Sequence, residues 1–394
     1  MIERPERLFS QSRRLAAVQT PVIPVVGRWI AETPGTISLG QGVVSYGAPA
    51  EAIAAARQFG GSLNDHRYGP VEGLPELVAA LEAKLARENA IHVRPSSRVV
   101  VTAGGNLAFM NAMLAITDPG DDVMLPVPYY FNHEMAIVMA GARVVPVPTT
   151  GDYQLDFGAM TRAITPKTRA IVTVSPNNPT GAVYPEAALR AVNALCRERG
   201  IFHVHDEAYE YFTYGGTAHF SPGSIDGAAP HTISLYSLSK AYGMASWRVG
   251  YMVIPEGLWE AVNKIQDTLL ICAPAISQRA ALAALVVGAG YARAHLSSLD
   301  RLRQQILAAL GDPSVPCDVA ESRGAFYFFI RVRRELDPLR LVERLIREHR
   351  IAVIPGTAFG AADGCYLRVS YGALDADTVS EGVTRLTAGL RAIS

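Results

Sequence analysis

Short runs rich in Val, Ile, Leu and Tyr alternate with longer amphipathic stretches from about residue 97 onward. Strand-length runs separated by helix-length stretches are typical of crossover units on a mainly parallel sheet, so we predict an α/β fold. Strands are expected near residues 98–102, 122–125, 142–146, 169–175, 201–205, 232–236 and 248–253. Helices are expected near residues 107–116, 131–139, 185–198 and 258–287.

The pattern changes after a further helix predicted over residues 293–310. The segment Gly311-Asp-Pro-Ser-Val-Pro316 interrupts it, and new strands are expected near 325–332 and 366–369. Because 394 residues exceed what one core usually holds, we predict a large domain over 46–295 and a small domain formed by 1–45 and 296–394. The N-terminal arm, with a helix near residues 8–18 and a Pro- and Gly-rich stretch over 34–49, joins the small domain or contacts a partner.

Composition argues against several classes of partner. The 36 Lys and Arg residues balance 36 Asp and Glu residues, so no basic surface for nucleic acid or an anionic membrane is expected. The longest charge-free apolar stretch, residues 280–292, is too short to span a bilayer and is predicted to be a buried helix. The start of the chain lacks a secretory pattern, and the four cysteines lie far apart. We expect a cytoplasmic protein without a metal site.

Several predicted strands end in polar or Gly-rich turns, the end at which open parallel sheets bind ligands. In Thr102-Ala-Gly-Gly-Asn106, two glycines precede a helix start, which suits the binding of phosphate by backbone N–H groups, although such turns are common. The loop Ser175-Pro-Asn-Asn-Pro-Thr-Gly181 is dense in turn formers. Within it, Asn178 precedes a proline, which favours extended backbone and an amide presented to a ligand.

Two charged residues also follow predicted strands. Lys240 ends the segment Ser237-Leu-Ser-Lys240 and precedes Arg248. A lysine with a lowered pKa forms a Schiff base with an aldehyde, while hydroxyls and a guanidinium bind phosphate. Taken alone, however, Lys240 fits an ordinary solvated lysine better. Asp206 is placed either to hold a pyridinium nitrogen protonated or, more simply, to cap the segment that starts at Glu207.

The order of these segments resembles that of the class I and II aminotransferases, which are fold-type I pyridoxal-phosphate enzymes. The resemblance runs from about Leu39 to Arg368 and rests on Tyr68, Gly104-Gly105, Tyr130, Asn178-Pro-Thr-Gly181, Asp206, Tyr209, Ser237-x-x-Lys240, Arg248 and Arg368. It implies a three-layer αβα sandwich with a mainly parallel seven-stranded sheet and a smaller α+β domain. It also implies pyridoxal 5'-phosphate as cofactor and an amino acid and a 2-oxo acid as substrates.

The resemblance further implies a role for each matching residue. Lys240 would hold the cofactor as a Schiff base and carry the proton, and Asp206 would pair with the pyridine nitrogen. Asn178 and Tyr209 would bracket the phenolic oxygen and favour its ionised form. Tyr68 would reach the phosphate from a second subunit, which implies a homodimer with shared active sites. The other residues expected at the phosphate are Gly104, Gly105, Asn106, Ser237 and Arg248.

Substrate contacts are also implied. Arg368 would bind the α-carboxylate in a bidentate pair, and Gly42 would leave room beside the substrate. Tyr130 would stack on the cofactor ring, unless it only packs in the core. Both Tyr130 and the segment Val43-Val-Ser-Tyr46 depart from common family patterns. The aromatic residues Phe326, Tyr327 and Phe359 suggest an apolar side-chain pocket for methionine, phenylalanine or tyrosine, although core packing explains them equally well.

We predict transamination with ping-pong kinetics, but the same residues support other reactions. These are β-elimination of cysteine conjugates, cyclopropane-forming synthesis and cofactor-dependent oxidation, because a fold does not settle a reaction. A ligand-sensing domain of a transcription regulator is the remaining alternative. The resemblance begins near residue 39, which leaves no room for an N-terminal DNA-binding domain, and the balanced charge gives no footprint for DNA.

Overall fold

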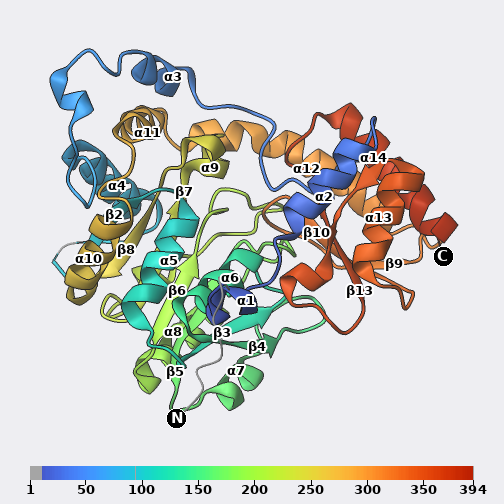
Figure 1. Ribbon diagram of the computed structural model, residues 1–394, viewed down its shortest axis with the longest axis horizontal. Helices are drawn as coiled ribbons and strands as arrows, with labels where there is room; N and C mark the ends of the chain where they lie inside the picture. Colours follow the sequence, from blue (N-terminus) through green and yellow to red (C-terminus); the bar gives the residue numbers. More distant parts are fainter. Residues whose placement is uncertain (1–10, 94, 394) are drawn as a thin grey trace, which may run out of the picture.

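The computed structural model describes residues 11–93 and 95–393, and a seven-stranded sheet lies at its centre (Figure 1). The strand order is β2-β8-β7-β6-β5-β3-β4, and only β8 runs antiparallel to its neighbours. All seven predicted strands are present, with their ends displaced by at most two residues, and the α/β fold class is confirmed. Their bounds are β2 Ser97–Thr102, β3 Asp122–Val127, β4 Arg143–Pro148, β5 Thr168–Val174, β6 Phe202–Asp206, β7 Thr232–Ser237 and β8 Gly250–Pro255.

Helices bury the apolar side chains of both faces of this sheet, which gives three layers. One face packs on α5 (Gly105–Ile116), α6 (Phe131–Ala140) and α10 (Trp259–Leu269). The other face packs on α7 (Phe157–Ala163) and α8 (Glu186–Arg199), and further along on α4 (Pro75–Glu88) and α11 (Ala275–Val287). Parallel strands need this cover, because their Val- and Ile-rich side chains are apolar on both sides. α3 (Ala50–Arg57) packs on α11.

A smaller antiparallel sheet, ordered β12-β13-β10-β9, forms the second part of the molecule. Its strands are β9 Cys317–Val319, β10 Tyr327–Val332, β12 Ile354–Pro355 and β13 Cys365–Ser370, of which β10 and β13 match predicted strands. The helices of this part are α13 (Pro338–His349) and α14 (Ala376–Ile393). α12 (Gly290–Leu310) runs across the predicted boundary at residue 295, so that boundary stays a proposal.

The N-terminal segment joins this second part. α2 (Val22–Glu32) packs against α13, and β1 (Ile37–Ser38) pairs in parallel with β11 (Ile351–Ala352). The helix predicted near residues 8–18 is α1 (Arg13–Ala17), and residues 8–10 of the prediction lie outside the described range. The placement of the arm thus favours the small sheet over a partner.

Two predicted helices are broken in the structure. The stretch 258–287 forms α10 and α11, because Ile271 has a positive φ of 68° and Pro274 precedes the second helix. The apolar stretch 280–292 is likewise not one helix, since Gly288, with φ 80°, separates α11 from α12. Among the described residues, no single helix is long and apolar enough to cross a membrane; only α11 and α12 together meet that measure, with a bend of 74° between them.

Candidate active site

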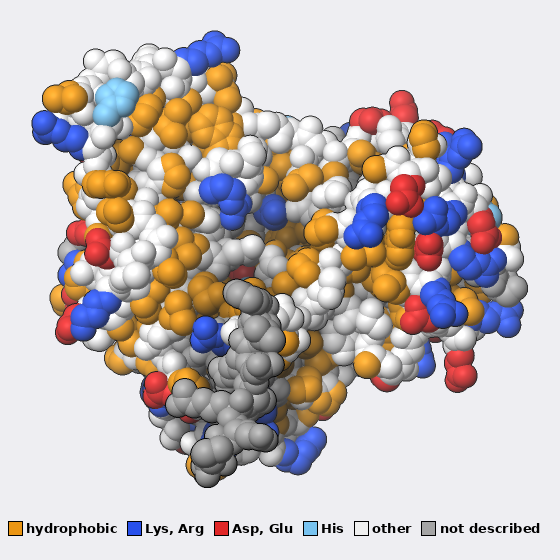
Figure 2. Space-filling view, viewed as in Figure 1, with side chains coloured by type: hydrophobic (Ala, Val, Ile, Leu, Met, Phe, Trp, Pro, Cys, Tyr) orange, Lys and Arg blue, Asp and Glu red, His pale blue; other side chains and the backbone are white. Residues whose placement is uncertain are grey.

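A cavity of about 210 Å³ lies at the carboxyl ends of β5, β6 and β7 and is closed by residues of the smaller sheet. Figure 2 shows that the molecular surface is hollowed between the two parts. Most of the residues that the sequence predicts in one site line this cavity, namely Gly42, Gly105, Asn106, Tyr130, Asn178, Asp206, Tyr209, Ser237, Lys240, Arg248 and Arg368. Gly104 and Tyr68 do not line it.

Lys240 lies on α9 (Leu238–Ala241), the short helix that follows β7. The Ser237 hydroxyl caps this helix by accepting a hydrogen bond from the Ser239 N–H (3.2 Å). Burial lowers the pKa of Lys240 to about 8, and the nearby charges of Arg368 and Arg248 also lower it. An amine with this pKa is neutral, and therefore nucleophilic, in mildly alkaline solution.

The main chain of Lys240 is fixed by the segment that departs from the family pattern. The Tyr46 hydroxyl donates to the Lys240 carbonyl oxygen (2.9 Å). A Cβ on Gly243, whose φ is +61°, would lie 2.5 Å from the Tyr46 carbonyl oxygen, so only glycine lets the two segments meet. Tyr46, which the sequence named only within a segment that departs from the family pattern, therefore supports the main chain of Lys240.

The start of α5 forms a place for an anion beside Arg248. The first N–H groups of a helix have no intrahelical acceptor, and the helix dipole favours negative charge there. Arg248 donates to the Ala103 carbonyl oxygen (3.2 Å), and a Cβ on Gly104, whose φ is +82°, would overlap the guanidinium. Gly104 thus supports the turn without lining the cavity. Ser237 lies next to this helix start, so a hydroxyl, a guanidinium and backbone N–H groups converge.

Asp206, the last residue of β6, is followed by a turn and not by the helix that it was predicted to cap, and its side chain faces the cavity. Its Oδ1 accepts a hydrogen bond from the Ala208 N–H (2.9 Å). Its Oδ2 lies 3.1 Å from Nε2 of His133, whose buried ring stacks on Phe109 with 4.0 Å between ring centroids. His133 was missed from the sequence, because only the folded structure brings α6 beside the end of β6.

Three polar side chains form a chain along the cavity wall. The Asn178 amide donates to the Tyr209 hydroxyl (3.4 Å), and the Tyr209 and Tyr327 hydroxyls lie 2.7 Å apart. Burial raises the pKa of Tyr209 well above its usual value, so the phenol keeps its proton. Tyr327, expected from the sequence in an apolar pocket, therefore has a polar contact as well. A Cβ on Gly42 would lie 2.8 Å from the Tyr327 oxygen, so a side chain there would displace Tyr327.

Arg368 on β13 is a buried cation, 2% exposed. It donates to Asn178 Oδ1 (2.9 Å) and to the Gly40 carbonyl oxygen (2.7 Å), and the rings of Tyr327 and Phe359 lie 4.8 and 5.0 Å from its guanidinium. Within residues 11–93 and 95–393, no carboxylate pairs with it, and its Nε has no partner. A buried guanidinium without a counter-charge suits a carboxylate ligand.

Several other lining residues were not predicted, and most of them are apolar or aromatic. Tyr130, which was predicted, turns its ring edge toward His133 (5.2 Å, 83°) and accepts a hydrogen bond from Asn132 (2.7 Å). Ile23 comes from α2, far away in the sequence, so no local pattern could have placed it here. The unpredicted lining residues are Ile23, Gln41, Phe131, Val174, Ala208 and Ser239.

Tyr68 lies outside the cavity of its own chain. Its side chain is 81% exposed in the segment between α3 and α4. An aromatic side chain this exposed has little to gain from its position in a single chain. Any role at a cofactor requires a second copy of the chain.

The donor set of the cavity fits pyridoxal phosphate. That molecule needs an amine for its aldehyde, an anion site, an acid for its ring nitrogen and donors to its phenolic oxygen. Lys240, the start of α5 with Arg248, Asp206, and the pair Asn178 and Tyr209 offer these groups around one cavity. The unpartnered Nε of Arg368 remains for a substrate carboxylate.

Comparisons with known proteins point to the same chemistry. The family model for aminotransferase class I and II matches residues 34–386. An aromatic aminotransferase of Arabidopsis thaliana is 35% identical over 388 residues, 96% of each chain. A probable aspartate/prephenate aminotransferase of Aquifex aeolicus is 35% identical over 337 residues, 83% of this chain and 84% of the relative. A solved tetra mutant of Thermus thermophilus aspartate aminotransferase, complexed with tryptophan, has a TM-score of 0.90 at 33% identity, covering 97% of this chain and 100% of that one.

Proposed function

The chain belongs to the class I and II aminotransferases, and we propose that its amino donor is an L-amino acid with an apolar or aromatic side chain, such as methionine, phenylalanine or tyrosine. It is a pyridoxal-phosphate-dependent transaminase that acts on amino acids and 2-oxo acids. The charges and shape of the catalytic cavity determine which amino acids fit as the donor.

The charges around the cavity carry this proposal. Among the described residues, the cations that line it are Lys240, Arg248 and Arg368. If the first two serve the cofactor and Arg368 takes the α-carboxylate, no further cation among the described lining residues remains for the second carboxylate of aspartate. The other walls include Ile23 and Phe131, which suit an apolar side chain. The name of the Arabidopsis relative agrees with this donor class, whereas that of the Aquifex relative favours aspartate.

The proposed mechanism assigns one task to each side chain. Bound pyridoxal phosphate supplies an electron sink for the charge left when an amino acid loses its α-proton. Arg368 binds the α-carboxylate and thereby orients the Cα–H bond toward Lys240. The Lys240 amine takes that α-proton. It then returns a proton to the carbon on the opposite side of the nitrogen that is transferred. Asp206 holds the proton on the ring nitrogen, and His133 fixes the orientation of Asp206.

Asn178 and Tyr209 would hold the phenolic oxygen of the bound cofactor, and the start of α5 with Ser237 and Arg248 would hold its phosphate. Since the donor must leave as an oxo acid before the acceptor enters the same cavity, ping-pong kinetics are expected. Parallel double-reciprocal lines would support this scheme.

We also propose a homodimer. Exposed apolar side chains gather at the end of the molecule that carries α3 and α11, at the upper left of Figure 2. They are Leu63, Tyr68, Leu269, Ile276, Val286 and Val287. A patch of this kind marks an interaction surface, and pairing with a second copy would bring Tyr68 to the partner's phosphate site. The four unpaired cysteines suit a reducing compartment, so we propose a cytoplasmic location.

A donor panel tests the proposed substrate class. Holoenzyme is mixed with excess of one amino acid and no acceptor, and the change in the cofactor absorbance gives the rate of the first half-reaction. We expect phenylalanine, tyrosine and methionine to react at least about tenfold faster than aspartate, a preference of about 1.4 kcal/mol. Faster reaction with aspartate would contradict the apolar donor. Release of ammonia without a new amino acid would contradict transamination itself.

A further inference from the structure

A second and larger cavity, of about 710 Å³, lies between the two parts of the molecule. One wall comes from the ends of β3 and β4 and the loop that follows β4, and the other from β9, β10, β13 and residues 360–363. None of its lining residues lines the catalytic cavity. Its volume falls in the range of small-molecule sites. We call it the seam cavity.

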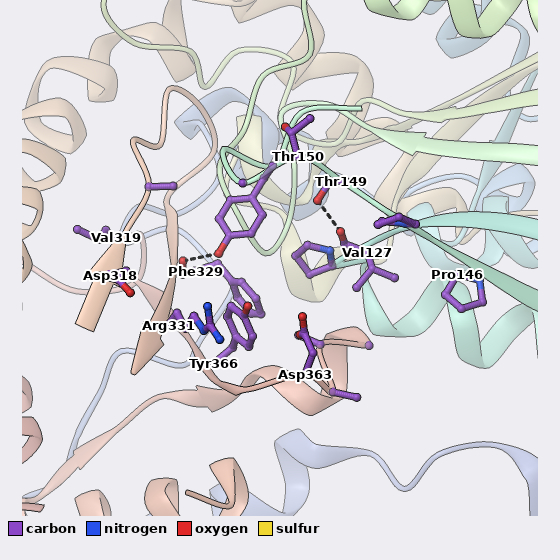
Figure 3. Close-up of a pocket in the computed structure, with 18 residues that line it drawn as sticks. Val127, Pro146, Thr149, Thr150, Asp318, Val319, Phe329, Arg331, Asp363 and Tyr366 are labelled. Carbon is purple, nitrogen blue, oxygen red and sulfur yellow. Dashed lines mark hydrogen bonds between the residues drawn. The ribbon is translucent and has the colours of Figure 1, made fainter. Parts of the chain in front are cut away.

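Aromatic rings form the floor of the seam cavity. Phe329 and Tyr366 stack with 5.3 Å between ring centroids and 9° between planes. The Tyr153 ring meets Phe329 edge-on (5.9 Å, 75°), and its hydroxyl donates to the Phe329 carbonyl oxygen (3.2 Å). Figure 3 shows Val127 and Pro146 on the opposite wall, facing these rings across the space. This shape suits a flat apolar group.

Three charged side chains line the same space, and one of them, Asp318, is already paired with Arg333 (2.8 Å). Arg331 lies two residues after Phe329 on β10, and its guanidinium lies 5.9 Å from the Tyr366 ring. Asp363 points toward this ring from the loop before β13 (Figure 3). Burial raises the pKa of Tyr366, the charge of Asp363 raises it further, that of Arg331 lowers it, and that of Asp318 also raises it, so the charges of the cavity act on one ring. No ion pair of either Arg331 or Asp363 occurs in the part of the chain that the structure describes.

We propose that the seam cavity binds a free aromatic α-amino acid as its zwitterion. Its carboxylate pairs with Arg331, its ammonium with Asp363, and its ring lies on Phe329 and Tyr366. An apolar slot flanked by a cation and an anion that have no ion pair of their own matches the three parts of such a molecule. A 2-oxo acid would leave Asp363 without a partner. The described residues that line the cavity include no lysine and no helix N-terminus, so its occupant is a bound effector and is not transaminated.

The seam cavity touches the groups that hold Arg368. Phe329 stands opposite Arg368 in the register of β10 and β13. The Phe329 ring also meets Phe359 (5.9 Å, 80°), and Phe359 flanks the Arg368 guanidinium at 5.0 Å. An amino acid in the seam cavity therefore packs on the layer beneath the carboxylate site and contacts both parts of the molecule. An amino acid bound in the seam cavity should change the KM for the amino donor.

Calorimetric titration of the holoenzyme with α-methyl-L-phenylalanine tests the proposal, because this probe has no α-proton and cannot be transaminated. We expect two molecules bound per chain in the unchanged protein. The Arg331→Gln variant should bind one molecule, because it loses binding at the seam cavity. Tyr366→Leu should weaken binding at the same cavity. Arg331 is exposed, so its replacement should not prevent folding. The matched control is Arg340→Gln, an exposed arginine on α13 that lines neither cavity, and it should still bind two.

Arg368→Gln distinguishes binding at the two cavities. It should remove binding at the catalytic cavity and keep binding at the seam cavity. If the Arg331→Gln variant still binds two molecules, the seam site is overturned. The seam site is also overturned if the unchanged protein binds one molecule and Arg368→Gln binds none. A single event that is lost with Arg331→Gln and kept with Arg368→Gln supports the seam site while counting against an aromatic donor. The two proposals can therefore fail independently.

Discussion

At the scale of single residues, the catalytic cavity combines two cations that differ in chemistry, the buried Arg368 and the half-buried Lys240. Arginine keeps its charge under all ordinary conditions, whereas a lysine loses its proton when it is buried. Burial and the Arg368 charge lower the pKa of Lys240 to about 8. One cation thus stays available for a carboxylate and the other becomes a neutral amine. Neither role is visible from one residue in the sequence, where Lys240 alone fits a solvated turn better.

The lowered pKa predicts how fast apoenzyme captures its cofactor at different pH values. The neutral amine attacks the aldehyde, so the capture rate should rise with pH and level off above about 8 instead of near the usual lysine value of about 10.4. Stopped-flow absorbance between pH 6.5 and 10 would measure this rate. Lys240→Ala should show no covalent capture at any pH. A rate still rising steeply at pH 9.5 would contradict the prediction.

Replacing Arg368 by lysine tests the geometry of the carboxylate site. Lysine keeps the charge but loses the fork that reaches Asn178, Gly40 and a carboxylate together. Since a hydrogen bond to a charged group contributes about 1.5–3 kcal/mol, kcat/KM for the donor should fall roughly 10- to 100-fold. The absorbance of the bound cofactor should not change. An equal loss with an amine that has no carboxylate would show that Arg368 acts in some other way.

At the scale of elements, the sequence predicted those strands and helices that have a clear hydrophobic pattern of their own. The large sheet is covered on both faces, so its strands are apolar runs that stand out, and all seven were found. The broken helices were missed because an apolar pattern continues through Ile271 and Gly288, while the left-handed φ at each is a tertiary outcome. The short strands β9 and β12 carry too few residues for a pattern. Ile23 and His133 reach the cavity through packing of whole helices, which no local motif encodes.

β6 also carries a polar cluster that links stability to pH. His205 and His203 are fully buried on the α8 side, and both bond to the Thr173 hydroxyl (2.6 and 2.8 Å). Burial lowers the pKa of His205 to about 4. The unfolded chain, with a histidine pKa of about 6.5, then binds more protons than the folded one between pH 6.5 and 4, so stability is present above 6.5 and is lost as pH falls through this window.

From these pKa values, His205 alone should lower the free energy of unfolding by about 2 kcal/mol between pH 7 and 5. Urea unfolding at several pH values would measure this dependence. His205→Gln keeps a polar side chain that does not titrate, and it should show a smaller loss over the same range. Equal pH dependence in both proteins would contradict the role of His205.

At the scale of the whole molecule, the two sheets meet at both cavities, and the face with α3 and α11 stays open. The residues proposed to bind the cofactor come mostly from the large sheet and its helices, whereas Arg368 and Tyr327 come from the small sheet. The relative placement of the two parts therefore sets the distance from the amine to the carboxylate site. Tyr68, a predicted cofactor ligand, is 81% exposed and does not line the catalytic cavity. Its role depends on a second copy.

Subunit mixing tests whether that copy completes the site. Tyr68→Ala should weaken phosphate binding and lower activity at limiting cofactor by about tenfold, the effect of about 1.4 kcal/mol, and Lys240→Ala should be inactive. After unfolding and refolding of an equal mixture, half of the dimers should be mixed. Each mixed dimer has one site with an intact Lys240 and an intact Tyr68 from its partner. Activity should then recover to about a quarter of that of the unchanged enzyme.

The matched control mixes Lys240→Ala with the unchanged chain and should give about half the full activity, because every intact lysine then meets an intact tyrosine. If each chain used its own Tyr68, the first mixture would show only half the residual activity of Tyr68→Ala. The exposed ring of Tyr68 rules out a packing role in its own subunit, so a loss of activity that its partner's copy restores can arise only across the interface. The shared site would then explain why the face around α3 and α11 stays apolar.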